Sequence, residues 1–271
     1  MIKLADNSTK GAVWDMWKAV FGDPDSYMEL YFRTKYSNDN TLIYFENEKP
    51  VASLQMLKFN FTFYGDELPI YYLSGVCTLP EARRKGYMDK LIIESFKVAK
   101  ERAIPLMLLV PQEEWLLKFY DKYGFAQTFD SGSEQLISLK ELNERHKGNL
   151  ESAYAEFDSN YRGQDMTVQK SFEDFKAIME EAALWDYPPK KSLIGMARVI
   201  DAKQLISIYA KHSTEDIATL RVIDKIIDKN NITVPISGSG HKIEMDVLNL
   251  AQLLLGYNTS EKAPQIHFML E

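Results

Sequence analysis

The sequence predicts an α+β protein with two parts: an N-terminal domain, in which helices flank a mixed, mostly antiparallel sheet, and a smaller C-terminal α+β domain. Three observations support this class. Residues 58–64 alternate in polarity, turn at Gly65-Asp66 and return through residues 68–74, the pattern of an antiparallel hairpin. Residues 71–110 read as strand, basic loop, amphipathic helix and apolar strand, which indicates a right-handed βαβ unit. After residue 139 a polar connector precedes a second series of strands and helices.

The elements ahead of the hairpin follow in order. Residues 1–36 predict two helices whose aromatic side chains gather on one face each, where they suit a core or the wall of a substrate cleft. Residues 41–45 and 51–56 predict strands around a turn at residues 47–50. The N-terminal domain therefore begins with helices and continues as an antiparallel meander.

The basic loop inside the βαβ unit predicts an anion site. Arg83, Arg84 and Lys85 supply charge, and Gly86 lets the backbone approach a ligand closely just before a helix begins. Free N–H groups at a helix start point outward where the macrodipole is positive. A pyrophosphate is the ligand that this arrangement suits.

A second motif follows the next strand. Residues 104–110 form a continuous apolar run, typical of a strand buried on both faces. Phe119-Tyr120 and Gly124-Phe125 come after it and place a hydroxyl-bearing aromatic residue near the end of the unit.

Together the two motifs resemble those of the GNAT superfamily of acetyl-coenzyme A-dependent N-acetyltransferases. Arg83-x-x-Gly86-x-Met88 resembles its phosphate loop, although Met88 stands where the family has Gly or Ala. The resemblance implies acetyl-coenzyme A as co-substrate and Tyr120 as the acid that protonates the departing thiolate. It also implies that one backbone amide, that of Val76, binds the thioester oxygen. The implied cofactor-binding residues are Val76, Cys77, Thr78, Arg83, Arg84, Lys85, Gly86, Tyr87 and Met88.

The C-terminal part carries a further resemblance. A strand at residues 135–139 is expected to end the first domain, and an amphipathic helix is expected at residues 167–185. The segments 220–224, 230–231 and 250–257 resemble a sterol carrier protein-like domain, as found at the end of the Enhanced intracellular survival acetyltransferases, which modify aminoglycosides. The chain resembles a shortened relative of that family. The predicted limits are an acetyltransferase domain at 1–145, a connector with the amphipathic helix at 146–189, and a sterol carrier protein-like domain at 190–271, which opens with a strand at 192–200.

The group that accepts the amine proton is less well defined. The resemblance implies a terminal carboxylate that reaches the active site, here on Glu271, although a frayed chain end is the competing interpretation. His267 is the one histidine close enough to this end to deserve a test. We interpret Cys77 as an inert core thiol and Glu113 and Glu114 as loop residues, and we expect Tyr123 to be structural.

Composition limits the partners. The net charge of −7 disfavours nucleic acid and favours a cationic substrate, and a single cysteine excludes an internal disulfide framework. The four histidines show no metal-ligand spacing, and no apolar run has the length of a membrane span or a signal segment, so we expect a cytoplasmic protein without a metal. A homo-oligomer is possible.

The sequence thus predicts an N-acetyltransferase that moves acetyl from acetyl-coenzyme A directly to a primary amine of a small, cationic substrate. Two alternatives stay open: a sensor that binds acetyl-coenzyme A without turnover, which Met88 favours, and a protein that carries an apolar ligand such as a lipid.

Overall fold

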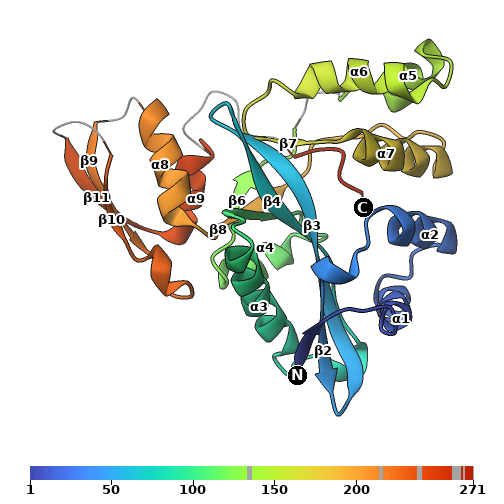
Figure 1. Ribbon diagram of the computed structural model, residues 1–271, viewed down its shortest axis with the longest axis horizontal. Coiled ribbons are helices and arrows are strands. Elements are labelled where there is room, and N and C mark those ends of the chain that lie inside the picture. The colour runs from blue at the N-terminus through green and yellow to red at the C-terminus, as the bar shows by residue number, and fades with distance from the viewer. Residues whose placement is uncertain (133–135, 214–215, 237–239, 258–263, 265, 271) are drawn as a thin grey trace.

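The computed structural model describes residues 1–132, 136–213, 216–236, 240–257, 264 and 266–270. Within these residues the strands form a large sheet and a small one, with helices on both faces of the large sheet (Figure 1). The first half of the chain contains β1 (Ile2–Leu4), α1 (Lys10–Phe21), α2 (Asp25–Thr34), η1 (Asn38–Asn40), β2 (Thr41–Glu46), β3 (Lys49–Phe63), β4 (Asp66–Thr78), η2 (Pro80–Ala82), α3 (Tyr87–Glu101), β5 (Leu106–Leu109), α4 (Trp115–Asp121) and β6 (Ala126–Phe129). The second half contains α5 (Leu139–Arg145), α6 (Leu150–Tyr161), β7 (Thr167–Gln169), α7 (Phe172–Leu184), β8 (Gly195–Val199), α8 (Ala202–His212), β9 (Ile217–Ile223), η3 (Asp228–Asn230), β10 (Thr233–Pro235), β11 (His241–Asp246) and α9 (Val247–Leu254).

The large sheet is mixed and mostly antiparallel, as predicted. Its strand order is β1-β2-β3-β4-β5-β8-β6, and β7 pairs with β3 beside this path. Among the described strands of this sheet only β4 and β5 pair in parallel, with Tyr71 opposite Met107. Helix α3 makes the connection between them, so the predicted βαβ unit is present.

Helices cover the two faces of the large sheet with separate apolar cores. Helices α1 and α2 pack on one face, where Trp17 and Tyr31 join Leu57 and Phe59 of β3. Helices α3 and α4 pack on the other face, where the core includes Phe96. Successive side chains of β3 point to opposite faces of the sheet, so they alternate between the two cores.

Strand β8 corrects the predicted arrangement of the C-terminal part. The strand expected to open a separate domain at residue 190 lies in the large sheet, where it pairs antiparallel with both β5 and β6. Its five residues are all buried, because an apolar core covers each face of the sheet here: Ala197 and Val199 belong to one core and Met196 to the other. The change from the large sheet to the small sheet therefore falls after β8, and not at the predicted limit of residue 190.

The segment between β6 and β8 also differs from expectation. The strand predicted at 135–139 is wrong over its described residues: 136–138 lie outside any strand, and α5 begins at Leu139. The region expected to be a plain connector contains α5 and α6. The helix expected from residue 167 starts only at Phe172, because Ser171 and Asp174 form a capping box there and residues 167–169 pair with β3 instead.

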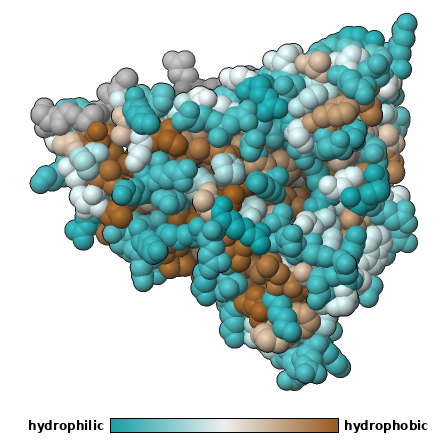
Figure 2. Space-filling view, in the orientation of Figure 1, coloured by the Kyte–Doolittle hydropathy of each residue, from teal (hydrophilic) through white to brown (hydrophobic). Residues whose placement is uncertain are grey.

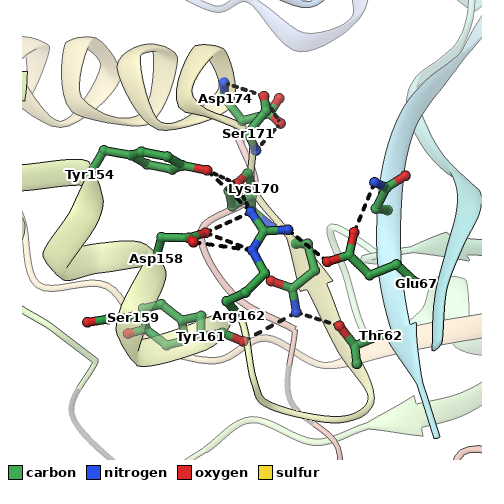
Figure 3. A network of polar contacts seen from close by, with 12 residues as sticks. Thr62, Glu67, Tyr154, Asp158, Ser159, Tyr161, Arg162, Lys170, Ser171 and Asp174 are labelled. Carbon is green, nitrogen blue, oxygen red and sulfur yellow. Dashed lines mark hydrogen bonds and ion pairs between the residues drawn. The ribbon is translucent and has the colours of Figure 1, made fainter. Parts of the chain in front are cut away.

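Arg162 fixes this segment to the large sheet (Figure 3). Its guanidinium donates to Asp158 of α6 at 2.7 Å and to Glu67 of β4 at 3.0 Å. It also donates to the backbone oxygen of Lys170 at 3.2 Å, just before α7 begins. One side chain thus joins α6, β4 and the start of α7.

The small sheet has the order β10-β9-β11 among the described strands, and α9 lies between it and the large sheet (Figure 1). Asp201 and Asp246 cap α8 and α9, each accepting a hydrogen bond from a backbone N–H in the first turn of its helix. A buried pair joins the sheets: Arg198 of β8 donates to both carboxylate oxygens of Asp224 at 2.8 Å.

Hydrophilic residues cover most of the face shown in Figure 2, and apolar residues show through in separate places, at the left over the C-terminal part and again in the lower centre near α3 and β2. Crossing a bilayer takes a longer and more apolar helix than any that the described ranges contain.

Candidate active site

The site is built where β4 and β5 separate. The two strands pair only from Ile70 to Tyr72 of β4 and from Leu106 to Leu108 of β5. Beyond Tyr72, the backbone groups of β4 that face away from β3 have no partner strand among the described residues. This edge can accept an extended ligand as an added strand.

A β-bulge interrupts β4 at the start of this free edge. Ser74 lies opposite Gln55 and Cys77 lies opposite Ser53, so Gly75 and Val76 together oppose the single residue Leu54. Gly75 has a φ of 57°, the left-handed conformation that glycine adopts without strain. Because a bulge leaves one residue outside the ladder, it can free the Val76 amide, which the family resemblance implies as the donor to the thioester oxygen.

Gly75→Ala is expected to damage this bulge. A Cβ atom at Gly75 would lie 2.5 Å from Cζ3 of Trp17, and the positive φ disfavours any side chain. Left-handed strain and overpacking together predict a loss of about 2–4 kcal/mol in the free energy of unfolding, with a parallel loss of activity. Urea denaturation measures the first effect. Gly11→Ala on helix α1 is the control, since nothing lies within 4 Å of its Cβ position, and an unchanged Gly75→Ala stability would contradict the geometry.

The phosphate loop follows β4. Arg84 and Gly86 both have positive φ, 63° and 73°, and α3 begins at Tyr87. Alternating left-handed residues turn successive N–H groups toward one side, which makes an anion-binding concavity. The side chains of Arg83 and Arg84 are exposed, and Arg83 Nε donates to the backbone oxygen of Thr78 at 3.2 Å. These features fit the pyrophosphate that the sequence predicted.

The remaining loop residues are placed differently. The ammonium of Lys85 lies 3.1 Å from the carboxylate of Glu46 on β2, so it is turned toward β2. The hydroxyl of Tyr87 also bonds to Glu46, and its ring stacks on Tyr44 at 4.2 Å between centroids. Met88 packs against the core under α3. Lys85 and Tyr87 therefore tie the loop to β2. Arg83 and Arg84 are left as the main side chains that can neutralise the charge of a bound anion.

A cavity of about 330 Å³ opens between the separated strands. This volume is in the range of small-molecule sites. Its walls come from β4, the end of β5, helices α1, α2 and α4, and two later segments: Trp17, Phe21, Asp23, Tyr27, Tyr72, Leu73, Ser74, Gly75, Val76, Leu109, Val110, Pro111, Gln112, Leu116, Tyr120, Leu193 and Leu270. The structure thus brings Val76 and Tyr120 to one cavity.

Tyr120 stands at the end of α4 and is 6 % exposed. Its ring packs edge-on against Phe119 and Phe125, and no hydrogen bond joins its hydroxyl to another described residue. Burial raises the pKa of the Tyr120 phenol above its usual value of 10. The hydroxyl therefore keeps its proton at neutral pH and is available as an acid.

Tyr123 and Gly124 have structural surroundings. The hydroxyl of Tyr123 donates to Asp89 in the first turn of α3, and Tyr123 is not among the residues that line the cavity. A Cβ at Gly124 would lie 2.9 Å from Val247 and 3.0 Å from the guanidinium of Arg198. The Gly-Phe motif therefore allows β8 and α9 to approach the turn after α4.

The C-terminal tail reaches the cavity. Leu270 lines it, and the neighbouring Met269 and Phe268 are buried. Glu271 lies outside the described residues. His267 packs on Tyr161 at 4.5 Å and does not line the cavity; burial lowers its pKa to about 3, with a further contribution from the charge of Lys170.

Other candidates from the sequence have ordinary surroundings. Cys77 is buried with its Sγ 3.3 Å from Oγ of Ser53, and burial raises the pKa of its thiol, which disfavours a nucleophile. Glu113 accepts a hydrogen bond from the exposed Trp115, and Glu114 is exposed. Among the described residues no group of histidine, cysteine and acidic side chains is arranged to hold a metal ion.

Asp23 is a site residue that the sequence analysis missed. It lines the cavity from the loop between α1 and α2, and its Oδ2 accepts a hydrogen bond of 2.6 Å from Nε1 of Trp17. The available signal was an acidic residue at the junction of two helices with aromatic faces. The sequence alone does not show in which direction the side chain of an isolated loop aspartate points.

Comparison with known proteins places the fold and the N-terminal part of the chain. A family model described as an acetyltransferase (GNAT) domain matches residues 1–128. The fold is similar to that of a GCN5-related N-acetyltransferase from Anabaena variabilis, with a TM-score of 0.67 and 14% identity over 93% of this chain and 89% of that chain. It is also similar to Eis1 from Mycobacterium abscessus, with a TM-score of 0.61 and 12% identity over 94% and 90% of the two chains. A probable N-acyltransferase from Enterococcus faecalis gives a TM-score of 0.61 and 14% identity over 95% and 90%.

A search of curated proteins found no match. At these low identities the solved structures establish the fold, and the family model identifies the catalytic part. Residues 1–128 are a GNAT acetyltransferase domain, and the protein is an acetyl-coenzyme A-dependent acetyltransferase.

Proposed function

We propose that the protein transfers the acetyl group of acetyl-coenzyme A directly to a primary amine of a small, cationic acceptor bound in the cavity. One observation carries the proposal: Val76 of the bulge, Tyr120 and Asp23 all line the same cavity of about 330 Å³.

Each of these groups has a role in the transfer. The phosphate loop would hold the pyrophosphate of the co-substrate, and the free edge of β4, at Val76, Cys77 and Thr78, would pair with its pantetheine arm. The Val76 amide would stabilise negative charge on the thioester oxygen as the amine attacks. The carbon–sulfur bond then breaks, and Tyr120 would give its proton to the thiolate.

The amine proton needs an acceptor. We propose the terminal carboxylate, carried by Glu271, because the preceding Leu270 lines the cavity. A carboxylate with a pKa of about 4 is a weak base, but it suffices once attack has made the nitrogen strongly acidic. Glu271→Gln removes only the side-chain carboxylate, and a variant that lacks the last four residues removes the terminal carboxylate as well. Both variants are assayed beside wild type, and loss of turnover in the shortened variant is the result expected for this role.

Asp23 supports a cationic acceptor, because a carboxylate on the wall of a largely apolar cavity attracts an ammonium group. Asp23→Asn keeps an oxygen for the bond from Trp17 and removes the charge. It is expected to raise KM for a cationic amine about tenfold, the range for a hydrogen bond to a charged group, and to leave KM for acetyl-coenzyme A unchanged. Steady-state kinetics check this. Asp25→Asn, whose side chain is 72% exposed, is the control, and equal acceptor KM values in wild type and Asp23→Asn would contradict the assignment.

The activity itself is tested by thiol release from acetyl-coenzyme A with a panel of diamines, polyamines, aminoglycosides, amino acids and peptide amines. Amine-dependent release establishes the transfer. Binding of acetyl-coenzyme A without release from any amine would favour the sensor interpretation.

The contacts of the C-terminal part favour a role in packing over a role in binding a lipid. Apolar residues of the small sheet, such as Leu220, join Leu250 and Leu254 of α9 in the core that is shared with the large sheet. We infer that this part is sterol carrier protein-like in its order of strands and helices and that its apolar surface holds the two sheets together.

A further inference from the structure

Gln55 is a buried amide without a partner. It lies in the middle of β3 and is 1% exposed. Neither its side-chain oxygen nor its side-chain nitrogen has a hydrogen-bond partner among the described residues. An unsatisfied buried polar group destabilises a fold, so a residue that keeps both amide atoms unpaired needs an explanation.

The position of Gln55 connects it to the site. It pairs with Ser74 of β4, directly beside the bulge. Its Nε2 lies 3.0 Å from the point that a Cβ at Gly75 would occupy, and Trp17 lies on the same side. Trp17, Ser74 and Gly75 all line the cavity. Gln55 itself is not among the residues that line the cavity, but its amide lies next to Gly75 and Trp17, which are.

The amide faces the acceptor side of the sheet. Along β3 the side chains of Leu57 and Phe59 belong to the core under α1 and α2, and Gln55 shares their face because strand residues alternate. Asp23 borders the cavity from the loop between these two helices. The phosphate loop lies at the start of α3, on the opposite face. Gln55 is therefore placed to meet the acceptor and not the nucleotide end of the co-substrate.

The neighbouring polar groups are already paired. Tyr31 donates its hydroxyl hydrogen to Oγ of Ser74 at 2.9 Å. Gln55 offers a donor and an acceptor a short distance apart, so a group that both accepts and donates, such as a hydroxyl or a carboxamide, satisfies both atoms at once.

We propose that Gln55 is a specificity-determining residue that binds a neutral hydroxyl or carboxamide group of the acceptor across Gly75. This inference rests on the proposed function, since it assigns the second polar group of the amine that Asp23 attracts. An acceptor with that group gains two hydrogen bonds, whereas an apolar analogue leaves the buried amide unpaired.

Two pairs of diamines test the assignment: 1,3-diamino-2-propanol against 1,3-diaminopropane, and lysinamide against 1,5-diaminopentane. Each pair differs only in the hydroxyl or the carboxamide. Wild type is expected to prefer the polar member of at least one pair about tenfold or more in kcat/KM. Gln55→Leu is expected to bring that ratio close to one through acceptor KM, with KM for acetyl-coenzyme A unchanged.

Thermal unfolding supplies a readout that does not need turnover. Gln55→Leu is expected to raise Tm, because it removes two unpaired polar atoms from a buried site. Gln169→Leu is the matched control: Gln169 is also buried, but its Nε2 donates to Thr62 at 2.7 Å and to the backbone of Tyr161 at 3.2 Å, so its replacement is expected to lower Tm.

Three results would overturn the inference. One is a wild-type enzyme that acetylates the diamines without preference in either pair. Another is a Gln55→Leu variant that retains the wild-type preference, and a third is a Tm that falls as it does in Gln169→Leu. In the first two cases the acetyltransferase activity on amines stands. No release with any of the four diamines or the wider amine panel would overturn the proposed function, and this inference with it.

Discussion

Replacing Tyr120 with phenylalanine is expected to lower kcat by about 10²–10⁴-fold, the range for loss of a positioned general acid. Tyr120 lines the cavity, and no other described residue forms a hydrogen bond with its hydroxyl. Phenylalanine keeps the edge-on contacts with Phe119 and Phe125, so the fold and the binding of acetyl-coenzyme A are expected to survive. Single-turnover kinetics, which isolate the chemical step, measure the effect.

Burial determines the pH dependence of this acid. Because burial raises the pKa of Tyr120 above 10, the hydroxyl stays protonated through neutral and mildly alkaline pH. Loss of the acid therefore does not limit kcat below about pH 10, the usual pKa of a phenol.

Tyr123→Phe is the matched control for Tyr120→Phe. Its hydroxyl donates to Asp89, so this variant loses a hydrogen bond between α3 and the turn after α4. It is expected to lower stability by about 1–3 kcal/mol, the range for a hydrogen bond to a charged group, while kcat changes only a few-fold. A collapse of kcat in Tyr123→Phe with an unaffected Tyr120→Phe would exchange the two roles.

Replacing Lys170 with methionine is expected to stabilise the protein by about 3–5 kcal/mol at pH 6. Lys170 is 5% exposed and lies just before α7. Its ammonium donates to the backbone oxygen of Val168 at 3.2 Å and approaches Sδ of Met269 at 3.3 Å. The nearby carboxylate of Asp174 already pairs with Lys35. Burial lowers the pKa of Lys170 to about 7. The negative charge of Asp174 acts in the opposite direction, and the positive charge of Lys35 lowers the pKa further.

The sign of the pH effect follows from this lowered pKa. An unfolded lysine has a pKa of about 10.5, so between pH 7 and 10.5 the unfolded state binds a proton that the folded state does not. Stability therefore rises with pH across this window and is lowest below pH 7. The 3.5-unit difference corresponds to roughly 5 kcal/mol. Lys170→Met is expected to remove this slope.

Urea denaturation at pH 6 and pH 9 measures the slope. Lys97→Met on α3 is the control, because its side chain is 63% exposed and its replacement is expected to change stability by less than about 0.5 kcal/mol. His267, with a pKa lowered to about 3, adds a separate loss of stability as pH falls below about 6.5, since the unfolded state gains that proton first. Equal slopes in wild type and Lys170→Met would show that Lys170 is charged and well solvated in the folded protein.

Local signals predicted much of the site. The basic loop, the start of α3 near Gly86 and the position of Tyr120 follow from residue type and spacing over short distances, and the structure brings Tyr120 and Val76 to one cavity. The bulge was missed, although a glycine inside a strand is its usual signal. Asp23 and Gln55 were missed because their roles depend on contacts between distant segments.

Errors in the fold have the same origin. The run at 195–199 has the composition of a buried strand, but composition does not say which sheet receives it. The residues 167–169 suit either a helix or a strand, and pairing with β3 decides for the strand. Helices α5 and α6 are short and largely polar outside a few core residues such as Phe157, so their periodicity is weak.

Strand β8 has a consequence for how the enzyme is made. It lies between β5 and β6, but the ribosome produces it only after residues 130–194. Until then β6 has no partner among the described strands, and one edge of β5 is open. A fragment that ends at residue 145 thus contains both sequence motifs but lacks β8, the strand that joins β5 to β6. Such an edge invites pairing with other chains, so the catalytic domain completes its folding late in synthesis and is poorly suited to expression by itself.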